Sequence, residues 1–434
     1  MGHLVGKDVF RKLGKKIDGM ETRAPWNDKL YAVLKELYTA EEAGIVIKMP
    51  YGLVTIEELE KVTGHERTAL RHLLDGLTKK GLVLDVWINE AYHYAPSPLV
   101  IGIFEFTMMR VGPDLNTKEW AKLFHEYMDQ SFFDANFGQG EQFSIFRALP
   151  YEETIQQSEY SEVLDYEKAS ALIAQADKFA IGLCSCRHEK LHLGEKSCDV
   201  PLESCTTFGV AAEMMIRHNL SREVSRSEME EHFARSREMG LVLTADNVRK
   251  NMKFVCHCCG CCCNLLQGIS QYGYPNIIVT STYLAEISDE TCSGCGKCAK
   301  ACPINAITLS AAEQGKKRKQ DAGVNSKICL GCGVCALKCP NGSLKLTKRE
   351  QSVIHPETTF ERLMLQCLEK GTLQNQIFAN PNRIDQKFMR TFVGAFLRLT
   401  PIKKALLSDK LRSGFLSAMK DGVRKQGKDW LLDL

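Results

Sequence analysis

The pattern of apolar and polar positions predicts helices soon after the start of the chain. Residues 1–26 are polar and basic, and they indicate a lightly packed arm. Apolar residues then recur at helical spacing. Thr39-x-x-Glu42 and Thr55-x-x-Glu58 both have the pattern of a capping box, in which the threonine oxygen accepts a backbone N–H and the glutamate reaches back. We therefore expect a helix to begin after each threonine.

The stretch after the second capping box predicts two helices and a hairpin. A short helix is expected over 56–62 and a longer one over about 66–79, where leucines gather on one face. Residues 82–88 and 91–94 predict a β-hairpin, because two apolar runs are joined by a short polar turn. In this order the elements resemble a winged helix-turn-helix over residues 28–97. The resemblance implies a winged-helix-like module that binds DNA or docks to a protein.

The polar residues of the longer helix bear on whether the module binds DNA or docks to a protein. In a DNA-binding module this helix would lie in the major groove. Its polar side chains are of mixed charge rather than a basic stripe, and it has no asparagine or glutamine to read a base. Nucleic-acid binding through residues 55–94 is therefore the alternative to protein docking. The polar side chains are Glu66, Arg67, Arg71, His72, Asp75, Lys79 and Lys80.

The middle of the chain predicts mostly helical packing. Residues 98–160 are rich in aromatic side chains, and we expect a helical connector without chemistry of its own. Residues 161–270 predict a mainly helical, cysteine-rich domain with one short apolar strand at 180–183. A third capping box, at Ser225, opens another helix of this domain.

Residues 356–434 predict a basic, amphipathic helical tail. From residue 383 onwards the chain carries twelve lysines and arginines against five aspartates, whereas the whole chain has a net charge of only +3. Apolar residues recur there at helical spacing. We expect this face to pack on the protein's own body, and peripheral contact with an anionic membrane or a partner is the alternative. The face comprises Phe388, Phe392, Phe396 and Leu399.

Two cysteine motifs of the same spacing carry the strongest chemical signal. The first is Cys-x-x-Cys-x-x-Cys-x-x-x-Cys-Pro at residues 292–303, and the second repeats it at 329–340. A cubane iron–sulfur cluster needs four converging thiolates, and in this spacing the fourth cysteine of each run ligates the cluster of the other run. Zinc sites rarely have eight cysteines in such a doubled pattern. Cluster I is thus assigned Cys292, Cys295, Cys298 and Cys339, and cluster II is assigned Cys329, Cys332, Cys335 and Cys302.

This stretch resembles the bacterial two-cluster ferredoxin module, and we expect a ferredoxin-like domain over residues 283–348. Glycines between the cysteines let the loops take positive φ angles and turn backbone N–H groups toward the sulfurs. The spacer between the motifs contains a basic run at 316–319, which predicts a solvated loop, and a docking patch for an acidic partner is the alternative. The resemblance implies two [4Fe–4S] clusters.

Ten more cysteines lie within residues 161–270. Four are widely spaced, and six crowd into residues 256–263 as Cys-His-Cys-Cys-Gly-Cys-Cys-Cys. Because neighbouring side chains of extended backbone point to opposite faces, these six cannot all reach one cubane without a tight turn. We expect them to be shared between one or two further iron–sulfur clusters, with spare thiols left as a redox-active pair or as ligands to an unusual cluster. The metal-ligand candidates are Cys184, Cys186, Cys198, Cys205, Cys256, Cys258, Cys259, Cys261, Cys262 and Cys263.

Neighbouring residues add to this picture. Arg187 can donate to a cluster sulfur and offset its charge. His257 is either a further ligand or an ordinary packing histidine. The triplet at 258–260 resembles the CCG motif of heterodisulfide reductase-type subunits, although only one such triplet occurs. Taken whole, the chain resembles the 4Fe-4S dicluster proteins of anaerobic bacteria, which implies iron–sulfur binding and redox work but names no substrate.

Composition narrows the class of protein. With 434 residues, the chain is expected to form an α+β multidomain protein. Nineteen cysteines, clustered at metal spacing, indicate a reducing compartment, hence a cytoplasmic protein of anaerobic or low-oxygen metabolism. No apolar run is long enough to cross a membrane. No Gly-rich dinucleotide fingerprint, P-loop or catalytic triad stands out, so we identify no catalytic residue.

Three functions stay open at this point. The first is an electron-transfer protein or oxidoreductase component, which takes electrons from a ferredoxin-like donor or reductase subunit. It relays them through the two clusters to the ten cysteines of residues 161–270, which we call the second cysteine field. The second is an iron–sulfur regulator that binds DNA in response to redox state. The third is a reductase with a catalytic cluster at residues 256–263.

Overall fold

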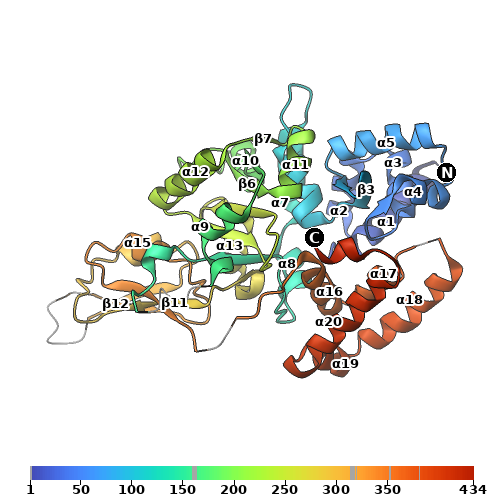
Figure 1. The fold of residues 1–434 in the computed structure, drawn as a ribbon. Coiled ribbons are helices and arrows are strands. Elements are labelled where there is room, and N and C mark those ends of the chain that lie inside the picture. Colours follow the sequence, from blue (N-terminus) through green and yellow to red (C-terminus); the bar gives the residue numbers. More distant parts are fainter. Residues whose placement is uncertain (1, 159–163, 313–317, 319, 351–352, 381) are drawn as a thin grey trace. The chain divides into compact units, whose positions relative to one another are not determined.

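The helices and strands of the computed structural model gather into two units (Figure 1). The mixture of helices and sheets agrees with the predicted α+β class. The division falls inside the predicted connector, between Phe143 and Ser144. Unit 1 comprises Met1–Phe143, Arg217–Leu220 and Thr358–Leu434, and unit 2 comprises Ser144–Ile216 and Ser221–Glu357. The structure describes residues 2–158, 164–312, 318, 320–350, 353–380 and 382–434.

Unit 1 begins with a helix, α1 (Gly2–Asp18), so the expected lightly packed arm is wrong. Leu13 and Ile17 are completely buried. Their four-residue spacing places both on one face of the helix. The lysines between them gave the stretch a polar average and concealed this face. Gly14 lets Trp26 approach closely, since a Cβ at this glycine would lie 2.5 Å from the Trp26 ring.

The next elements of unit 1 follow the predicted order. Thr39 and Thr55 both make the reciprocal hydrogen bonds of a capping box, so the two predicted helix starts are confirmed. The hairpin is present as well, and its strands pair antiparallel in a three-stranded sheet of order β1-β3-β2. The elements are α2 (Asp28–Leu37), α3 (Ala40–Lys48), β1 (Val54–Thr55), α4 (Ile56–Thr63), α5 (Arg67–Lys79), β2 (Val83–Ile88) and β3 (Ala91–Pro96).

The remaining helices of unit 1 come from the connector and from the C-terminal part of the chain. Phe143, Leu365 and Phe415 belong to one buried apolar cluster, which brings these two segments together. The connector contributes η1 (Leu99–Ile103), whose three central residues have non-helical φ and ψ angles, and α6 (Phe104–Met109), α7 (Thr117–Tyr127) and α8 (Gln130–Phe137). The C-terminal part contributes α16 (Thr359–Lys370), α17 (Leu373–Ile377), α18 (Ile384–Leu397), α19 (Thr400–Leu407), α20 (Asp409–Arg424) and a 3₁₀ turn, η6 (Asp429–Leu432).

The phenylalanine face of α18 does not pack on the protein, so the expectation that it would do so is wrong. Phe388, Phe392 and Phe396 are 70%, 68% and 52% exposed. The opposite side of α18 packs instead, through Gly394 and Leu397. Gly394 permits this contact because it leaves room for the side chain of Gln374, which would lie 2.9 Å from an added Cβ.

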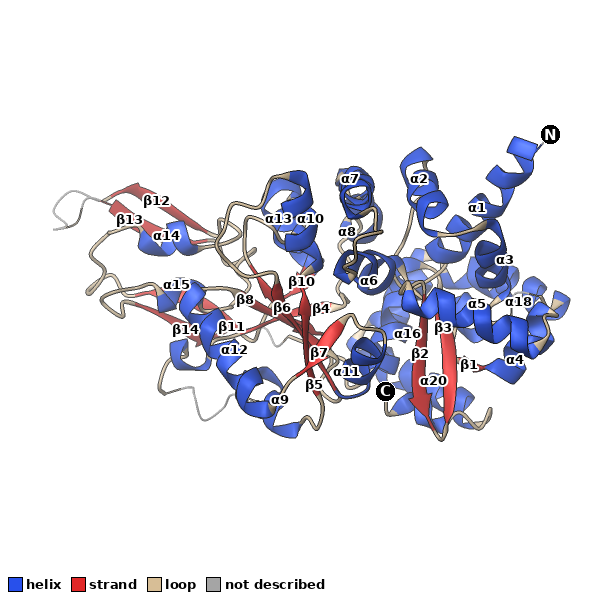
Figure 2. Ribbon diagram, turned by 90° about the horizontal axis from the view of Figure 1, so that it is seen from above, coloured by secondary structure: helices blue, strands red, loops and turns tan. Residues whose placement is uncertain are grey.

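Unit 2 is organised around a seven-stranded sheet of order β10-β4-β8-β9-β6-β5-β7 (Figure 2). All neighbouring strands are antiparallel except β10 and β4. Figure 2 shows α10 and α13 on one side of this sheet and α9 and α12 on the other. The strands are β4 (Phe146–Leu149), β5 (Phe179–Leu183), β6 (Glu203–Phe208), β7 (Ser221–Glu223), β8 (Val242–Asp246), β9 (Phe254–Cys258) and β10 (Ile278–Val279).

The prediction of a mainly helical middle domain omitted this sheet. Helices are present, and the predicted strand at 180–183 is confirmed as β5, but the other strands of the sheet were not predicted. Every residue of β4 and β8 is buried, so these strands lack the alternation that marks a half-exposed sheet. β6 is rich in serine, cysteine and threonine and has no apolar run. The helices are α9 (Ala169–Gln175), α10 (Ser185–Leu193), α11 (Gly209–Arg217), α12 (Arg226–Met239) and α13 (Asn264–Tyr272).

The rest of unit 2 includes two antiparallel strand pairs and two short helices, and this part of the chain carries the repeated cysteine motifs. Each motif loop leads into one of the short helices. Among the described residues, no helix has the length and apolar character needed to cross a bilayer. The elements are β11 (Tyr283–Ile287) paired with β14 (Leu344–Lys348), β12 (Ile307–Ala311) paired with β13 (Gln320–Val324), α14 (Lys297–Ala301) and α15 (Val334–Leu337).

Substitution of Leu13 tests whether α1 belongs to the folded core of unit 1. Leu13→Ala is expected to lower the free energy of unfolding by about 2–5 kcal/mol, because it leaves a cavity at a fully buried position. Lys15→Ala, on the exposed side of the same helix, is expected to cost less than about 1 kcal/mol. Tryptophan fluorescence during urea unfolding reports this unit, since all four tryptophans lie in it. Equal effects of the two substitutions would contradict the packing of α1.

Candidate metal centres

One cavity of unit 2 collects four cysteines from both repeated motifs. Its lining includes Cys292, Cys295 and Cys298 of the first run and Cys339 of the second run. The three cysteines of the first run lie on the loop before α14 and at its start, and Cys339 follows α15. The two runs therefore meet at this cavity, although Cys339 lies at least 41 positions further along the sequence than the other three cysteines.

A second cavity has the complementary membership. Its lining includes Cys329, Cys332 and Cys335 of the second run together with Cys302 of the first run. Each cavity thus has three thiols from one motif and the last thiol of the other motif. The eight cysteines of the motifs are divided between the two cavities in the same grouping as the clusters assigned from the sequence.

The loops around these cavities depend on glycine at two equivalent positions. Gly294 and Gly331 have φ angles of +66° and +69°, in the left-handed region that favours glycine. A Cβ at Gly294 would lie 2.4 Å from the Gln320 carbonyl oxygen, and a Cβ at Gly331 would lie 2.1 Å from the Tyr283 carbonyl oxygen. Any larger side chain would push the loop off the neighbouring strand. The glycines are therefore required for the loops to close around the cavities.

Two arginines hold the first cysteine of each motif in place. Arg318 donates a hydrogen bond to the carbonyl oxygen of Cys292 at 3.3 Å and pairs with Asp289 at 2.7 Å. Arg349 donates to the carbonyl oxygen of Cys329 and, at 2.9 Å, to that of Tyr283. The same contact is therefore made at both motifs, and it brings one positive charge close to each four-cysteine set.

Electrostatics in the two cavities favour a bound cation. Burial raises the pKa of the Cys332 thiol to about 12. A hydrogen bond from the backbone N–H of Lys297 lowers the pKa of Cys295, at the more exposed end of the other cavity. The backbone N–H of Ala306 donates to the Cys302 sulfur at 3.2 Å. A metal centre would supply the positive charge that keeps such buried thiols ionised.

The second cysteine field lies at the ends of strands β5 and β9, where the chain leads into helices α10 and α13. Cys184 occupies the N-cap position of α10, and Cys263 occupies that of α13. Backbone N–H groups at the start of each helix offset part of the cost of a thiolate. The contact with Cys186 and burial nevertheless raise the pKa of Cys184. For Cys263, the contact with Cys186 lowers the pKa, but the contact with Cys258 and burial outweigh it and raise the pKa overall. Asn264 and Glu189 join the two helices with a hydrogen bond of 2.7 Å. Cys205 and Cys256 are direct partners on the neighbouring strands β6 and β9.

Four cysteines of this field form a compact group. The Cys198 sulfur lies 3.7 Å from that of Cys259 and 3.8 Å from that of Cys262. The Cys261 sulfur lies 3.6 Å from both Cys259 and Cys262. All four sulfurs lie within 4.8 Å of one another. We call Cys198, Cys259, Cys261 and Cys262 the four-sulfur group.

The other six cysteines form a second, more extended set, which we call the six-thiol group. Hydrogen bonds between these thiols shift their pKa values in opposite directions. The contact with Cys256 lowers the pKa of Cys258 to about 5. Contacts with Cys205 and Cys258 raise the pKa of Cys256. Neighbouring thiols in this group are Cys184 and Cys186, Cys186 and Cys263, Cys263 and Cys258, Cys258 and Cys256, and Cys256 and Cys205.

Arg187 lies between the two groups as a buried cation. Its guanidinium donates to the Ser204 hydroxyl and to the His257 carbonyl oxygen. Together with a hydrogen bond from Cys262, which has the larger effect, the charge of Arg187 lowers the pKa of Cys259 to about 4. The guanidinium therefore sits where the sequence analysis expected it, next to a sulfur.

His257 points away from the sulfurs. Its ring packs edge-on against His232 and Phe233 of α12, with centroid distances of 4.6 Å and 4.7 Å. Burial lowers its pKa, so the ring is neutral. Cys256 and Cys258 flank it in the strand and therefore face the other side of the sheet. Of the two interpretations of His257, the geometry favours the packing histidine.

The second cysteine field lies directly against a ferredoxin-type motif. Gly260, in the middle of the crowded segment, approaches Pro303 so closely that an added Cβ would lie 2.9 Å from the Pro303 carbonyl oxygen. Pro303 follows Cys302, which lines the second cavity. The thiols of the two fields therefore belong to adjoining parts of one unit. The sequence separation of more than 40 residues gave no sign of this contact, nor of the role of Arg349.

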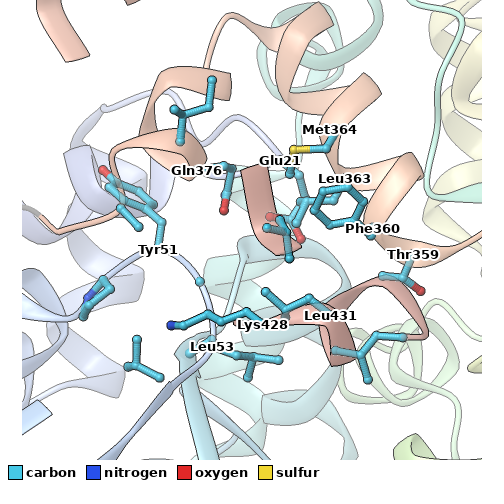
Figure 3. Close-up of a pocket in the computed structure, with 18 of the residues that line it drawn as sticks. Glu21, Tyr51, Leu53, Thr359, Phe360, Leu363, Met364, Gln376, Lys428 and Leu431 are labelled. Atoms are coloured by element: carbon cyan, nitrogen blue, oxygen red, sulfur yellow. The ribbon is translucent and has the colours of Figure 1, made fainter. Parts of the chain in front are cut away.

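Unit 1 contains an unrelated cavity of about 340 Å³ between the segment that holds β1, β2 and β3 and the C-terminal helices (Figure 3). Phe360, Leu363 and Met364 of α16 line one side of it. Glu21 and Gln376 add polar groups, and burial raises the pKa of Glu21. Lys428 adds a cation to a lining that is otherwise mostly apolar. No cysteine lines this cavity.

Comparison with known proteins identifies one part of the chain. A sequence model of the family described as the 4Fe-4S dicluster domain matches residues 291–343. No curated protein and no solved structure matches the chain. The matched segment contains both repeated motifs, so the chain carries a ferredoxin-type iron–sulfur domain.

Paired glycine substitutions test how the motif loop closes. Gly331→Ala adds a Cβ at positive φ and against the Tyr283 carbonyl, whereas Gly342→Ala adds one at positive φ with no atom within 4 Å. Gly342→Ala is expected to cost about 1–2 kcal/mol. Gly331→Ala is expected to cost a further ~1–3 kcal/mol because the loop must shift. The stability of both variants is measured by the loss of visible iron–sulfur absorbance during urea titration. Equal midpoints for the two variants would show that the close approach of Gly331 to the Tyr283 carbonyl is unimportant.

Proposed function

We propose that this chain is an iron–sulfur electron-transfer protein, or the electron-transfer component of an oxidoreductase, with two [4Fe–4S] clusters in its ferredoxin-type domain. The proposal rests chiefly on the two cavities, each with four cysteines drawn from both motifs. Cluster I would be held by Cys292, Cys295, Cys298 and Cys339, and cluster II by Cys302, Cys329, Cys332 and Cys335.

The chain's own residues would position the clusters, place positive charge beside them and exclude water. Bound [4Fe–4S] clusters exchange single electrons at low potential, with about −400 mV for plant-type ferredoxins as a reference. Arg318 and Arg349 place one positive charge beside each four-cysteine set. Burial of Cys329 and Cys335 excludes water from one side of the second cavity, while Cys295 keeps the first cavity close to the surface. A partner protein would therefore exchange electrons at the side of Cys295.

The second cysteine field is the proposed destination of the electrons. Its crowded segment adjoins the second cavity through Gly260 and Pro303, so transfer between them would be short. We propose that the six-thiol group holds one further iron–sulfur cluster. All 19 cysteines are free of disulfides, which supports a reducing compartment such as the cytoplasm. A reductase whose catalytic centre is this field remains the alternative, and it predicts that a substrate alone reoxidises the reduced protein.

The winged-helix-like elements of residues 28–97 are better suited to a structural or docking role than to DNA. The side chain of Glu66 caps the start of α5, where a groove-binding helix would approach phosphates. Arg67 is paired with Glu57 and Glu60 rather than presented outward. At the opposite side of these elements, Trp430 packs on His93 with a centroid distance of 4.6 Å. We therefore propose that this domain supports the C-terminal helices.

The exposed face of α18 supports a second proposal, peripheral attachment to an anionic membrane. Phe388, Phe392 and Phe396 form an apolar stripe along the helix. Exposed lysines occur nearby on α18 and on the helices that follow it, at Lys387 and Lys404. An amphipathic helix with this pattern lies in the interface with its apolar face among the acyl chains and its cations at anionic headgroups.

Double substitutions test the crossed cluster assignment. Cys302→Ser combined with Cys332→Ser is expected to lose no more iron and sulfide than either single variant, because both cysteines belong to cluster II. Cys302→Ser combined with Cys295→Ser is expected to lose about twice as much, because the two cysteines of this one run serve different clusters. Iron and acid-labile sulfide are counted on protein purified without air.

The same samples test the function itself. The wild-type protein is expected to show two clusters that accept one electron each at low potential, near the ferredoxin range of about −400 mV, in an EPR-monitored redox titration. Cys367→Ala, a buried cysteine in unit 1, serves as the control and should leave the titration unchanged. The assignment would be disproved if the Cys302 and Cys332 double variant lost about twice as much iron as a single variant and the Cys302 and Cys295 double variant did not. Clusters that cannot be reduced would disprove low-potential electron transfer.

Vesicle binding tests the exposed stripe. The double variant Phe388→Ser, Phe392→Ser is expected to bind phosphatidylserine-containing vesicles at least about tenfold more weakly than wild type, because each phenylalanine contributes roughly 1.5–3 kcal/mol when buried. Leu411→Ser, at an exposed apolar position of α20, is the matched control and should retain binding. Wild-type protein that stays in the supernatant at every vesicle concentration would rule out the proposal.

A further inference from the structure

We infer that the four-sulfur group binds a single metal ion as a mononuclear tetrathiolate site, separate from any iron–sulfur cluster. The inference concerns Cys198, Cys259, Cys261 and Cys262, and it does not depend on the function proposed for the ferredoxin-type domain. The ion is one that prefers four thiolates in a tetrahedron, which is Zn²⁺ or Fe²⁺.

The spacing of the sulfurs carries this inference. Four of the sulfur pairs in the group are separated by 3.6–3.8 Å, and no pair is farther apart than 4.8 Å. Bonds of about 2.3 Å from zinc to four sulfurs in a tetrahedron give sulfur–sulfur edges of about 3.8 Å. The group therefore has the size of one metal ion with four thiolate ligands.

A cubane cluster needs a wider arrangement. Each of its four thiolates binds a different iron, so the sulfurs stand farther apart than around one ion. Within the part of the chain that the structure describes, the four-sulfur group is the one set whose ligand atoms all lie within 4.8 Å. The two four-cysteine sets of the ferredoxin-type motifs do not meet this spacing. One structure thus contains thiol sets of two different sizes, which indicates two kinds of metal centre.

The chain around the group fixes its ligands. Three of them lie in one tight turn, closed by a hydrogen bond of 3.1 Å from the Cys263 N–H to the Cys259 carbonyl. Gln267 donates to the Cys261 carbonyl oxygen at 2.8 Å. Cys198 comes from the loop after α10, and Lys196 donates to its carbonyl oxygen. The metal would therefore tie this loop to the start of α13.

Charge also fits a divalent ion. Four thiolates around one divalent ion leave a net charge of −2, and the Arg187 guanidinium contacts Cys259 and offsets part of it. With four protein ligands the ion has no open position for a substrate or water, so its role is structural or limited to electron transfer. Because these four cysteines are committed to one ion, the second field has only the six-thiol group left to hold a cluster.

Variants of single ligands distinguish one ion from a cluster. Cys261→Ser and Cys198→Ser are expected to lose about one metal atom per chain and no acid-labile sulfide, when the full-length protein is purified without air and analysed for zinc, iron and sulfide. Cys367→Ala, outside both cysteine fields, should keep the full content. Loss of several irons with an equal number of sulfides would overturn the inference, and so would no loss of metal. Iron and sulfide of the ferredoxin-type domain should stay constant, so failure here leaves the proposed function untouched.

A measurement on the wild-type protein covers the case in which these variants do not fold. If the ion is zinc, zinc-edge X-ray absorption should show four sulfur neighbours at about 2.3 Å and no iron neighbour. If the ion is iron, Mössbauer spectroscopy should resolve one tetrathiolate iron per chain beside the cluster iron. Absence of both signals would disprove the mononuclear site.

Discussion

Crowded thiols are the constraint on which unit 2 depends. Deprotonated sulfurs only a few ångströms apart repel one another, and burial adds a further cost to their charge. Burial raises the pKa of Cys332 to about 12, so without compensation such a thiol holds its proton and binds no metal. The arrangement is therefore stable as a set of ligands only when a cation sits among the sulfurs.

The fold provides part of that compensation before any metal binds. Cys184 and Cys263 stand at the first turns of two helices, where backbone N–H groups offset part of the cost of negative charge, although thiol contacts and burial raise both pKa values overall. Arg187 brings a buried guanidinium to the second field, and Arg318 and Arg349 bring one each to the two motif loops. These groups lower the cost of ionising the thiols, and they also fix the loops through hydrogen bonds to carbonyl oxygens. Charge compensation and loop geometry are thus provided by the same side chains.

Features set by neighbouring residues could be predicted from the sequence, and features set by distant contacts could not. The capping boxes at Thr39 and Thr55 formed because both partners lie within one turn. The repeated cysteine spacing located the iron–sulfur domain that the family comparison identifies at residues 291–343. In contrast, β8 is buried along its whole length and gives no alternating pattern, so the seven-stranded sheet was missed.

The same limit applied at both ends of the chain and at the candidate site. The apolar face of α1 was concealed by the lysines among its residues, of which Lys12 and Lys15 are exposed and Lys16 is buried. The phenylalanines of α18 were expected inside because apolar residues usually are, yet Gly394 directs the opposite side of that helix inward. The sequence also located all ten cysteines of the second field but not their division into four and six. That division depends on which loops the sheet and two helices bring together, and spacing along the chain does not encode it.

The contact between Gly260 and Pro303 explains why the two cysteine fields belong to one unit. A glycine is needed there because an added Cβ would lie 2.9 Å from a backbone oxygen that cannot move independently of the Cys302 loop. The crowded segment and the ferredoxin-type motif therefore fix one another's position through main-chain atoms rather than through exchangeable side chains. In a protein that moves electrons, the separation of centres controls the rate of transfer, and rigid backbone contact is the most direct way to hold that separation constant. Placing a closed, four-thiolate ion in the same turn would stiffen the segment on its other side as well.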